Sequence, residues 1–377
     1  MGTIRRAGER KFVMPVKTLP SNAHLDHLKH QARDLMRDVR VHDAQAAQRI
    51  REFHPRFLKA TDAEVFGAGL HLSDAQLVIA RERGFASWTR LKRHVEKPTL
   101  ADNLSAPLHE RIEDPAFRHA VDLLDQGEAE ALWAYLKAHP GLVRQRVLFE
   151  GGNYFRNPGL LEFAAENPIR HGKLPANIVA VVRVILEAGA RDANAALNET
   201  LVLVCSGSVA RECGVQIPLI DVLCGYGADP GAGLTAALVH GEFEAAHELI
   251  RLGGRVDLPA AAALGQVDEG RRLLSTASGE ERHWAVALAA QFGHAEMVRL
   301  LLDAGEDPNR YNPPGAHSHS TPLHQAALAG HLDVVRLLLE RGARPDLKDT
   351  MWQGTAEGWA ACAGKTEVAE LLRSLKQ

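Results

Sequence analysis

The feature that most constrains the fold is a pattern that recurs three times near the C-terminal end of the chain. Each copy places two alanines three and four residues before a glycine, and the copies cover residues 283–309, 320–346 and 354–375. Aligning Gly293, Gly330 and Gly364 superimposes them with offsets of 37 and 34 residues. A period of this length is typical of arrays in which each unit buries its apolar face against the next. The sequence therefore predicts a stack of repeated units instead of one globular core.

The middle copy shows how one unit is expected to fold. A short helix begins near Thr321 and ends at Gly330, because glycine readily adopts the left-handed conformation that closes many helices. The small side chains of Ala326 and Ala327 allow this helix to lie close to its partner. A second helix is predicted over 332–341, since its aliphatic residues recur at helical spacing. Each unit is thus a pair of helices followed by an extended connection.

Residues 321–326 read T-P-L-H-Q-A, which resembles the signature T-P-L-H-x-A of the ankyrin repeat family. The resemblance covers 283–349 closely, extends to the end of the sequence and weakens upstream. It implies an all-α, ankyrin-type helical solenoid with short β-hairpin fingers in the last few units. It also implies that His324 hydrogen-bonds the turns of stacked units, and that His294 and His331 cap helices and bridge neighbouring units.

Weaker copies of the pattern extend toward the N-terminal end of the chain. The expected segments are a flexible N-terminus (1–19), a helical module (20–97), a linker (98–109) and the repeat array (110–377). Within the array, the units are expected to be irregular over 110–230, short over 231–282 and regular over 283–377. The helical module is similar to a segment found ahead of ankyrin arrays in bacterial proteins, and that similarity implies no activity.

Charge and cysteine content narrow the class of protein. The net charge is -3, but residues 1–100 hold 19 Lys and Arg against 11 Asp and Glu. This basic front leaves a nucleic-acid or anionic-surface adaptor as an alternative function, although a solvated helical surface is the simpler interpretation. Four cysteines without a C-x-x-C pair favour a reducing compartment, and no apolar stretch reaches the length of a membrane span. We therefore expect a cytoplasmic protein with no membrane contact.

The sequence contains no motif that predicts catalysis or a cofactor. It has no G-x-S-x-G, H-E-x-x-H or P-loop pattern, so we expect no enzyme, no catalytic residue and no cofactor. His317 and His319 are candidates for a metal site, but zinc takes three or four ligands, and no cysteine or carboxylate is near them in the sequence. We expect no metal there. An enzyme with a site in the irregular segment 150–215 is kept as a further alternative.

The resemblance implies a scaffold that binds a protein partner, which the sequence does not identify, on the concave surface made by fingers and first helices. The family pattern places positions after the T-P-L-H motif, positions before the helix-ending glycine and finger residues on this surface. Aromatic residues are only 5% of the chain, yet several occur at these positions, and aromatic residues are frequent binding anchors. The expected protein-binding residues are Leu288, Gln291, Phe292, Arg310, Tyr311, Asn312, Gln325, Leu328, Met351, Trp352 and Trp359.

Overall fold

The computed structural model describes residues 17, 19, 24–96, 107–149, 154–189 and 194–375. The chain divides into two compact units, residues 1–163 and 164–377. Most of the predicted flexible N-terminus (1–19) and most of the predicted linker (98–109) lie outside the described residues. The segment boundaries predicted from the sequence stay predictions. Among the residues described, no helix is both long and apolar enough to cross a membrane.

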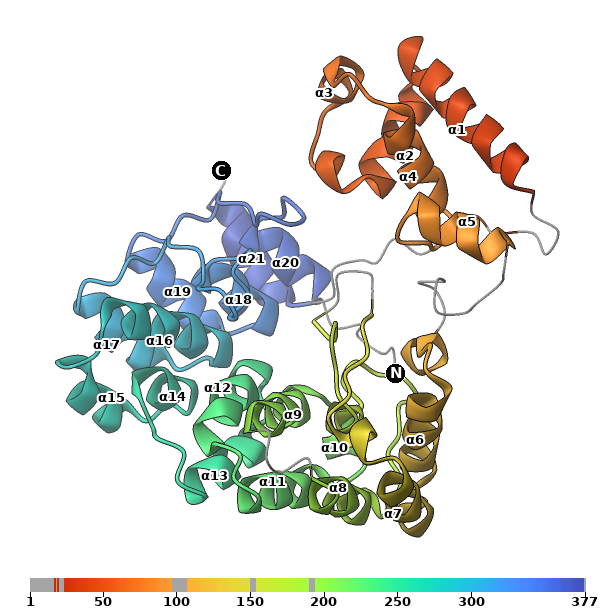
Figure 1. Ribbon diagram of the computed structural model, residues 1–377. Helices are drawn as coiled ribbons and strands as arrows, with labels where there is room; N and C mark the ends of the chain where they lie inside the picture. Colours follow the sequence, from red (N-terminus) through yellow and green to blue (C-terminus); the bar gives the residue numbers. More distant parts are fainter. Residues whose placement is uncertain are drawn as a thin grey trace. The chain divides into compact units, whose positions relative to one another are not determined.

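The first unit contains a helical module built around one apolar core (Figure 1). Its helices are α1 (Leu25–Arg40), α2 (Ala44–Phe53), α3 (Asp62–Gly67), α4 (Leu72–Arg81) and α5 (Trp88–Glu96). On α1, residues at helical spacing, among them Leu28, Leu35 and Val39, form the buried face. The carboxylate of Asp43 accepts the N–H of Ala46 and so caps α2 at a distance of 2.7 Å. The predicted N-terminal helical module is therefore present.

The remainder of the first unit is a helix pair followed by an extended arm. Helices α6 (Pro115–Gln126) and α7 (Ala129–Ala138) are joined by Gly127, whose φ is 76°. In the arm, the N–H of Val147 donates to the carbonyl of Pro158 at 3.0 Å. The 3-10 helices in the described residues of both units are η1 (Pro55–Phe57), η3 (Leu108–Arg111), η4 (Pro140–Val143) and η5 (Leu161–Ala165).

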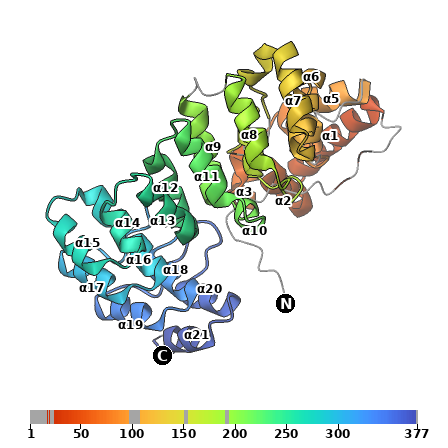
Figure 2. The ribbon, with the colours of Figure 1, turned by 90° about the horizontal axis from the view of Figure 1, so that it is seen from below.

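The second unit is a stack of helix pairs arranged in two layers (Figures 1 and 2). Its helices are α8 (Ile178–Glu187), α9 (Asn194–Ser206), α10 (Val209–Glu212), α11 (Gln216–Gly225), α12 (Pro230–His240), α13 (Phe243–Arg251), α14 (Leu258–Ala263), α15 (Val267–Leu274), α16 (Gly279–Phe292), α17 (Ala295–Asp303), α18 (Pro322–Ala329), α19 (Leu332–Glu340), α20 (Ala356–Cys362) and α21 (Thr366–Ser374).

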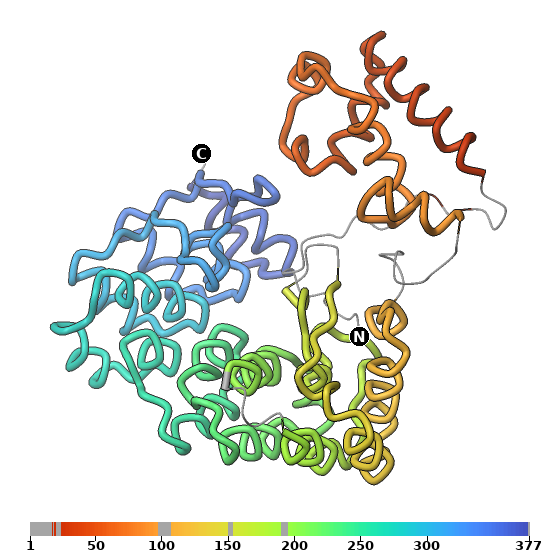
Figure 3. Tube along the Cα trace, in the orientation of Figure 1, coloured from red at the N-terminus to blue at the C-terminus, as the bar shows by residue number. Residues whose placement is uncertain are grey.

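The two layers separate the first helices of the units from the second helices. The first helices α9, α12, α14, α16, α18 and α20 each contact the next in this order, and the second helices, from α11 to α21, lie along the other side. Figure 3 shows the chain passing from layer to layer in each pair. The aliphatic residues of the last units form one continuous core, which includes Val298, Leu301, Val335 and Leu338. The predicted all-α repeat solenoid is confirmed.

Neighbouring units interlock at the point where each first helix ends. Gly293 closes α16 with a φ of 80°, and a Cβ placed on it would lie 2.6 Å from Nδ1 of His331 in the next unit. The other ring nitrogen of His331, Nε2, lies 3.1 Å from the carbonyl oxygen of Gln291. His294 makes the same kind of contact one unit earlier, over Gly265. The predicted bridging role of His294 and His331 is confirmed.

The connections between the last units are not the β-hairpin fingers expected from the resemblance, and this part of the prediction is not supported. The described part of the chain contains no β-strand, and the connection after α19 has only an isolated bridge between Lys348 and Thr355. In the connection after α17, Pro313 and Pro314 lack the N–H groups that a ladder needs. In the connection after α19, the backbone turns around the carboxylate of Asp349. Both fingers are therefore compact loops.

Replacing Gly293 and Gly364 by alanine tests the interlock. Both glycines have positive φ, 80° and 70°, so each alanine should cost roughly 1–2 kcal/mol of backbone strain. Only at Gly293 does the new Cβ meet the ring of His331, whereas at Gly364 nothing lies within 4 Å. Gly293→Ala should therefore lower the free energy of unfolding, measured with urea, by about 1–3 kcal/mol more than Gly364→Ala does. Equal losses in the two variants would show that the close approach contributes nothing.

The short units around α14 and α15 are predicted to open before the regular units. Helix α14 has six residues, four of them alanine, and the buried residue of α15 is Gly270. Little apolar area is therefore buried per helix, and local stability follows that area. In native-state hydrogen exchange, amides of α14 and α15 should exchange faster than those of α18 and α19. Faster exchange in α18 and α19 would show that the short units are not the least stable part of the array.

Candidate functional site

Two neighbouring loops of the second unit, finger 1 (residues 306–320) and finger 2 (residues 343–355), are joined by hydrogen bonds. The hydroxyl of Tyr311 in finger 1 donates to the carbonyl of Lys348 in finger 2 at 2.6 Å. The backbone N–H of Thr350 donates to the carbonyl of His319 at 2.8 Å. These bonds join residues more than 30 positions apart in the chain, so the two fingers support each other.

Asp349 organises finger 2 from the inside. Its side chain is fully buried, and its carboxylate accepts the backbone N–H groups of Met351, Trp352 and Gly354 at 2.8, 2.5 and 2.8 Å. It also accepts the indole N–H of Trp359 at 3.0 Å. Burial by itself raises the pKa of this carboxyl, but the N–H groups that it accepts outweigh burial and leave the pKa below its usual value. A charged Asp349 therefore fixes the course of the loop.

This loop presents two large apolar side chains to solvent. Met351 is 46% exposed and Trp352 is 47% exposed, although their backbone N–H groups are bound to Asp349. The indole of Trp352 lies with its ring centre 5.9 Å from that of Trp359 and 5.1 Å from that of His319. These edge-to-face contacts limit the orientations open to the indole. Trp352 is therefore both exposed and held in place.

His324 has the structural role that the resemblance implies. Its Nδ1 accepts the backbone N–H of Thr321 at 3.3 Å and lies 2.8 Å from the hydroxyl of the same residue. Nε2 consequently carries the proton and donates to the carbonyl of Gly354 in the next unit at 3.2 Å. Burial lowers the pKa of His324, which favours this neutral form. The predicted hydrogen bond between turns of stacked units is confirmed.

His317 and His319 lie together in finger 1. Their rings are T-shaped, with centres 6.1 Å apart, and both side chains are partly buried. Burial, together with the neighbouring His319 and His240, lowers the pKa of His317 to about 4. Within the described ranges, no group of three or more His, Cys, Asp or Glu residues is arranged to hold a metal ion. The rings are neutral near pH 7 and contribute to packing in the finger.

The structure places the predicted protein-binding residues in three environments. Four are exposed: Arg310, Leu328, Met351 and Trp352. Four are partly buried: Gln291, Phe292, Tyr311 and Trp359. Three are buried, with at most 4% of the residue exposed: Leu288, Asn312 and Gln325. The amide of Gln325 donates to the hydroxyl of Ser320 at 2.8 Å. That these residues contact a partner stays a prediction.

Gln291 and Phe292 contribute to the array itself. The amide of Gln291 donates to the carbonyl of Val239 at 2.8 Å. The ring of Phe292 packs against that of Phe243, with ring centres 4.9 Å apart. Both residues belong to α16 and reach the α12–α13 pair, so they pass beyond the short helix α14. The side chains of Gln291 and Phe292 therefore serve mainly as contacts between units of the array.

Two residues that organise the fingers are absent from the residues predicted from the sequence. One is Asp349. It could have been found from its place just before the turn residues Met351 to Gly354, because aspartate side chains commonly accept backbone N–H groups two or three residues ahead. The other is His283, whose Nε2 lies 2.8 Å from the carbonyl of Tyr311. No repeat signal identifies His283, because the aligned position in the next unit is Ser320.

The irregular segment 150–215 is the place where the sequence leaves room for an enzyme site. Its buried Glu166 pairs with Arg170 and accepts the backbone N–H groups of Arg170 and Gly172, at 2.6 and 3.0 Å from the same carboxylate oxygen. Burial raises the pKa of the Cys205 thiol, so this cysteine is not a ready nucleophile. These polar groups are used to hold the local backbone. The described geometry of the segment gives no support to the enzyme alternative.

Acid is predicted to destabilise the array before carboxylates titrate. The pKa of His317 is lowered to about 4, and burial also lowers the pKa values of His324, His331 and His283, so the unfolded chain binds protons more tightly. Stability present at pH 7 should therefore be lost as pH falls below about 6.5, the ordinary histidine value. For His317 alone the loss should be on the order of 1–3 kcal/mol by pH 4.

Urea unfolding between pH 7 and pH 4 measures this loss. His317→Asn should flatten the dependence on pH, and asparagine tolerates the positive φ of 59° at this position. His247→Gln, at an exposed position on α13, is the matched control and should leave the dependence unchanged. If His317→Asn has the same dependence on pH as the wild type, His317 does not carry the effect.

Comparison with known protein families agrees with this architecture. The model of the family described as "Ankyrin repeats (3 copies)" matches residues 208–349 and, in a second match, residues 286–376. No curated protein matches the chain. Ankyrin repeats are in general protein–protein interaction modules and are typically without catalytic activity. Residues 208–376 of the chain therefore carry ankyrin repeats.

Proposed function

We propose that this chain is a non-enzymatic scaffold that binds one protein partner through the surface around finger 2. The observation that carries the proposal is the pair Met351 and Trp352, which are about half exposed while their backbone is held by the buried carboxylate of Asp349. Exposed tryptophan is favoured as a binding anchor. A surface that is already ordered loses little conformational entropy when a partner binds.

We include in this surface the exposed residues Leu328 of α18 and Arg310 of finger 1. The bond between Tyr311 and Lys348 keeps the two fingers in register. In this proposal, recognition lies in the regular part of the array, 283–377, and the helical module 20–97 folds separately. The four cysteines are free, which supports placing this function in the cytoplasm.

Charge pairing in the helical module supports protein binding over the nucleic-acid alternative. The buried carboxylate of Glu82 pairs with Lys17 at 3.0 Å and with Arg49 at 2.5 Å. Several positive charges of this module are thus used inside it, and fewer remain for phosphates.

The proposal is tested by capture from a cytoplasmic extract of the source organism, followed by mass spectrometry. The double variant Met351→Ala, Trp352→Ala should reduce recovery of the partner at least about tenfold, because it removes the anchors. Tyr311 is left in place, since its loss would also remove a hydrogen bond between the two fingers. The thermal melt should change little, because the backbone bonds to Asp349 remain.

Leu375→Ala is the matched control, because Leu375 is 51% exposed and lies after α21, away from the fingers in sequence. It should capture the partner as the wild type does. Full capture by the double variant, with an unchanged melt, would move the binding surface elsewhere.

A further inference from the structure

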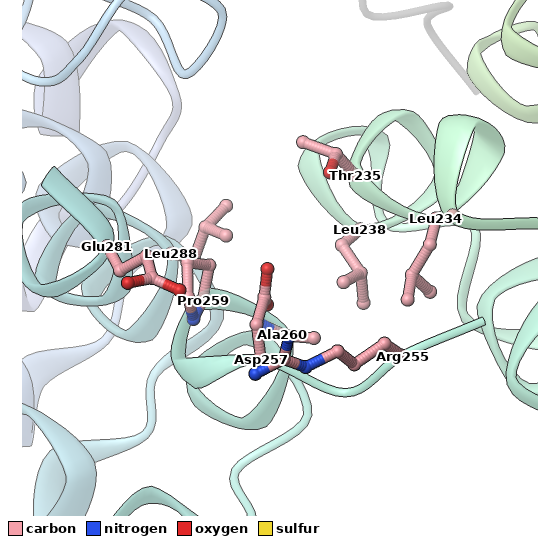
Figure 4. Close-up of a pocket in the computed structure, with 10 residues that line it drawn as sticks. Leu234, Thr235, Leu238, Arg255, Asp257, Pro259, Ala260, Glu281 and Leu288 are labelled. Carbon is pink, nitrogen blue, oxygen red and sulfur yellow. The ribbon is translucent and has the colours of Figure 1, made fainter. Parts of the chain in front are cut away.

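The array has a recess beside its shortest first helix. Helix α14 has six residues, whereas its neighbours α12 and α16 have 11 and 14. The alanine side chains of α14 are too short to fill the space between those neighbours. At one end of α14, Gln291 and Phe292 of α16 close the space by reaching Val239 and Phe243. At the other end the space stays open (Figure 4).

Apolar and polar groups line this recess in about equal measure. Leu234 and Leu238 line it from α12, Leu288 lines it from α16, and Pro259 and Ala260 line it from α14. Figure 4 shows the two α12 leucines pointing toward the segment that carries Arg255. The volume of about 210 Å³ is below the roughly 300–1,000 Å³ typical of cofactor and drug-sized sites. The recess therefore suits one side chain of a larger molecule.

The charged groups at the rim differ in what they can offer a partner. The carboxylate of Asp257 caps α14 by accepting the N–H of Ala260 at 2.9 Å. The carboxylate of Glu281 accepts the N–H of Ser278 at 2.8 Å in the capping box of α16. Both negative charges thus already lie at helix N-termini, where the helix dipole stabilises them.

Arg255 is the exposed cation of the rim. Its guanidinium forms no ion pair or hydrogen bond with any part of the chain that the structure describes, and it acts on the carboxylate of Glu281 only through the longer-range attraction of opposite charges. A cation beside the leucine side chains of the recess favours an anionic group next to an apolar one.

We propose that the recess binds a leucine or isoleucine side chain of the partner protein, with an aspartate or glutamate beside it in the partner pairing with Arg255. The aliphatic side chain would contact Leu234, Leu238 and Leu288 and leave water. The neighbouring carboxylate would remain at the rim. This inference rests on the proposed scaffold function and adds a second contact, separate from the fingers, that selects partners by local sequence.

The test uses a displayed library of 12-residue peptides selected on the immobilised full-length chain. Selected peptides should be enriched in leucine or isoleucine next to an acidic residue. Thr235→Trp places a large ring at the exposed rim of the recess and should weaken their binding about tenfold or more. Arg255→Glu should weaken binding about threefold to tenfold, since an exposed ion pair contributes modestly.

A reciprocal change of charge makes the test specific. When the acidic residue of the best peptide is replaced by lysine, wild-type binding should fall, and Arg255→Glu should bind this lysine peptide more tightly than the wild type does. Arg336→Glu is the matched control, because Arg336 is exposed on α19 and distant in sequence from the recess. It should bind every peptide within about twofold of the wild type.

Three results would overturn the inference. They are failure to enrich any peptide, enriched peptides that bind Thr235→Trp as tightly as the wild type, and a dimer of the chain that Thr235→Trp dissociates in light scattering. The third result would assign the recess to a second copy of the chain. If capture of the natural partner still depends on Met351 and Trp352, the proposed scaffold function survives each of these results.

Discussion

The array depends on the contact between a helix-ending glycine and the side chain that rests on it from the next unit. Gly265, Gly293 and Gly330 have positive φ, and a Cβ added to each would lie 2.6, 2.6 and 2.8 Å from the side chains of His294, His331 and Lys365, in that order. Glycine is therefore needed at these positions for two reasons: a Cβ would strain the backbone, and it would occupy the space of the neighbouring side chain. At Gly364, by contrast, an added Cβ would meet nothing within 4 Å. The contact thus sets where neighbouring units meet.

The sequence motif that produces this contact was predictable, and so were the two layers of helices. A glycine at a period near 35 residues, with alanines before it and a histidine after it, specifies helix ends and close packing without reference to any distant residue. The resemblance to the ankyrin repeat family implies the roles of His324 and His331, and the structure confirms them. Helix pairs of this kind are predictable because their contacts are mostly between adjacent units.

The residues of the site were predictable only in part, for a physical reason. Whether a residue on a first helix faces solvent depends on the size of its neighbours in space. Gln291 and Phe292 are turned to internal contacts because α14 is too short to separate α16 from α12. Asn312 and Gln325 are buried, and the amide of Gln325 donates to the hydroxyl of Ser320 in finger 1. Met351 and Trp352 could be located as finger residues, but their fixed backbone depends on four donors that converge on Asp349.

The shortness of α14 links stability to recognition. A six-residue helix of small side chains buries little area, so its unit gains less from packing than the units around α18. The same lack of side-chain volume leaves the recess between Leu238 and Leu288 open. An array with a full-length helix at this position would pack more tightly, but it would have no recess and no place for Arg255 at a rim. The irregular unit is therefore the place where this otherwise regular surface can distinguish one partner sequence from another.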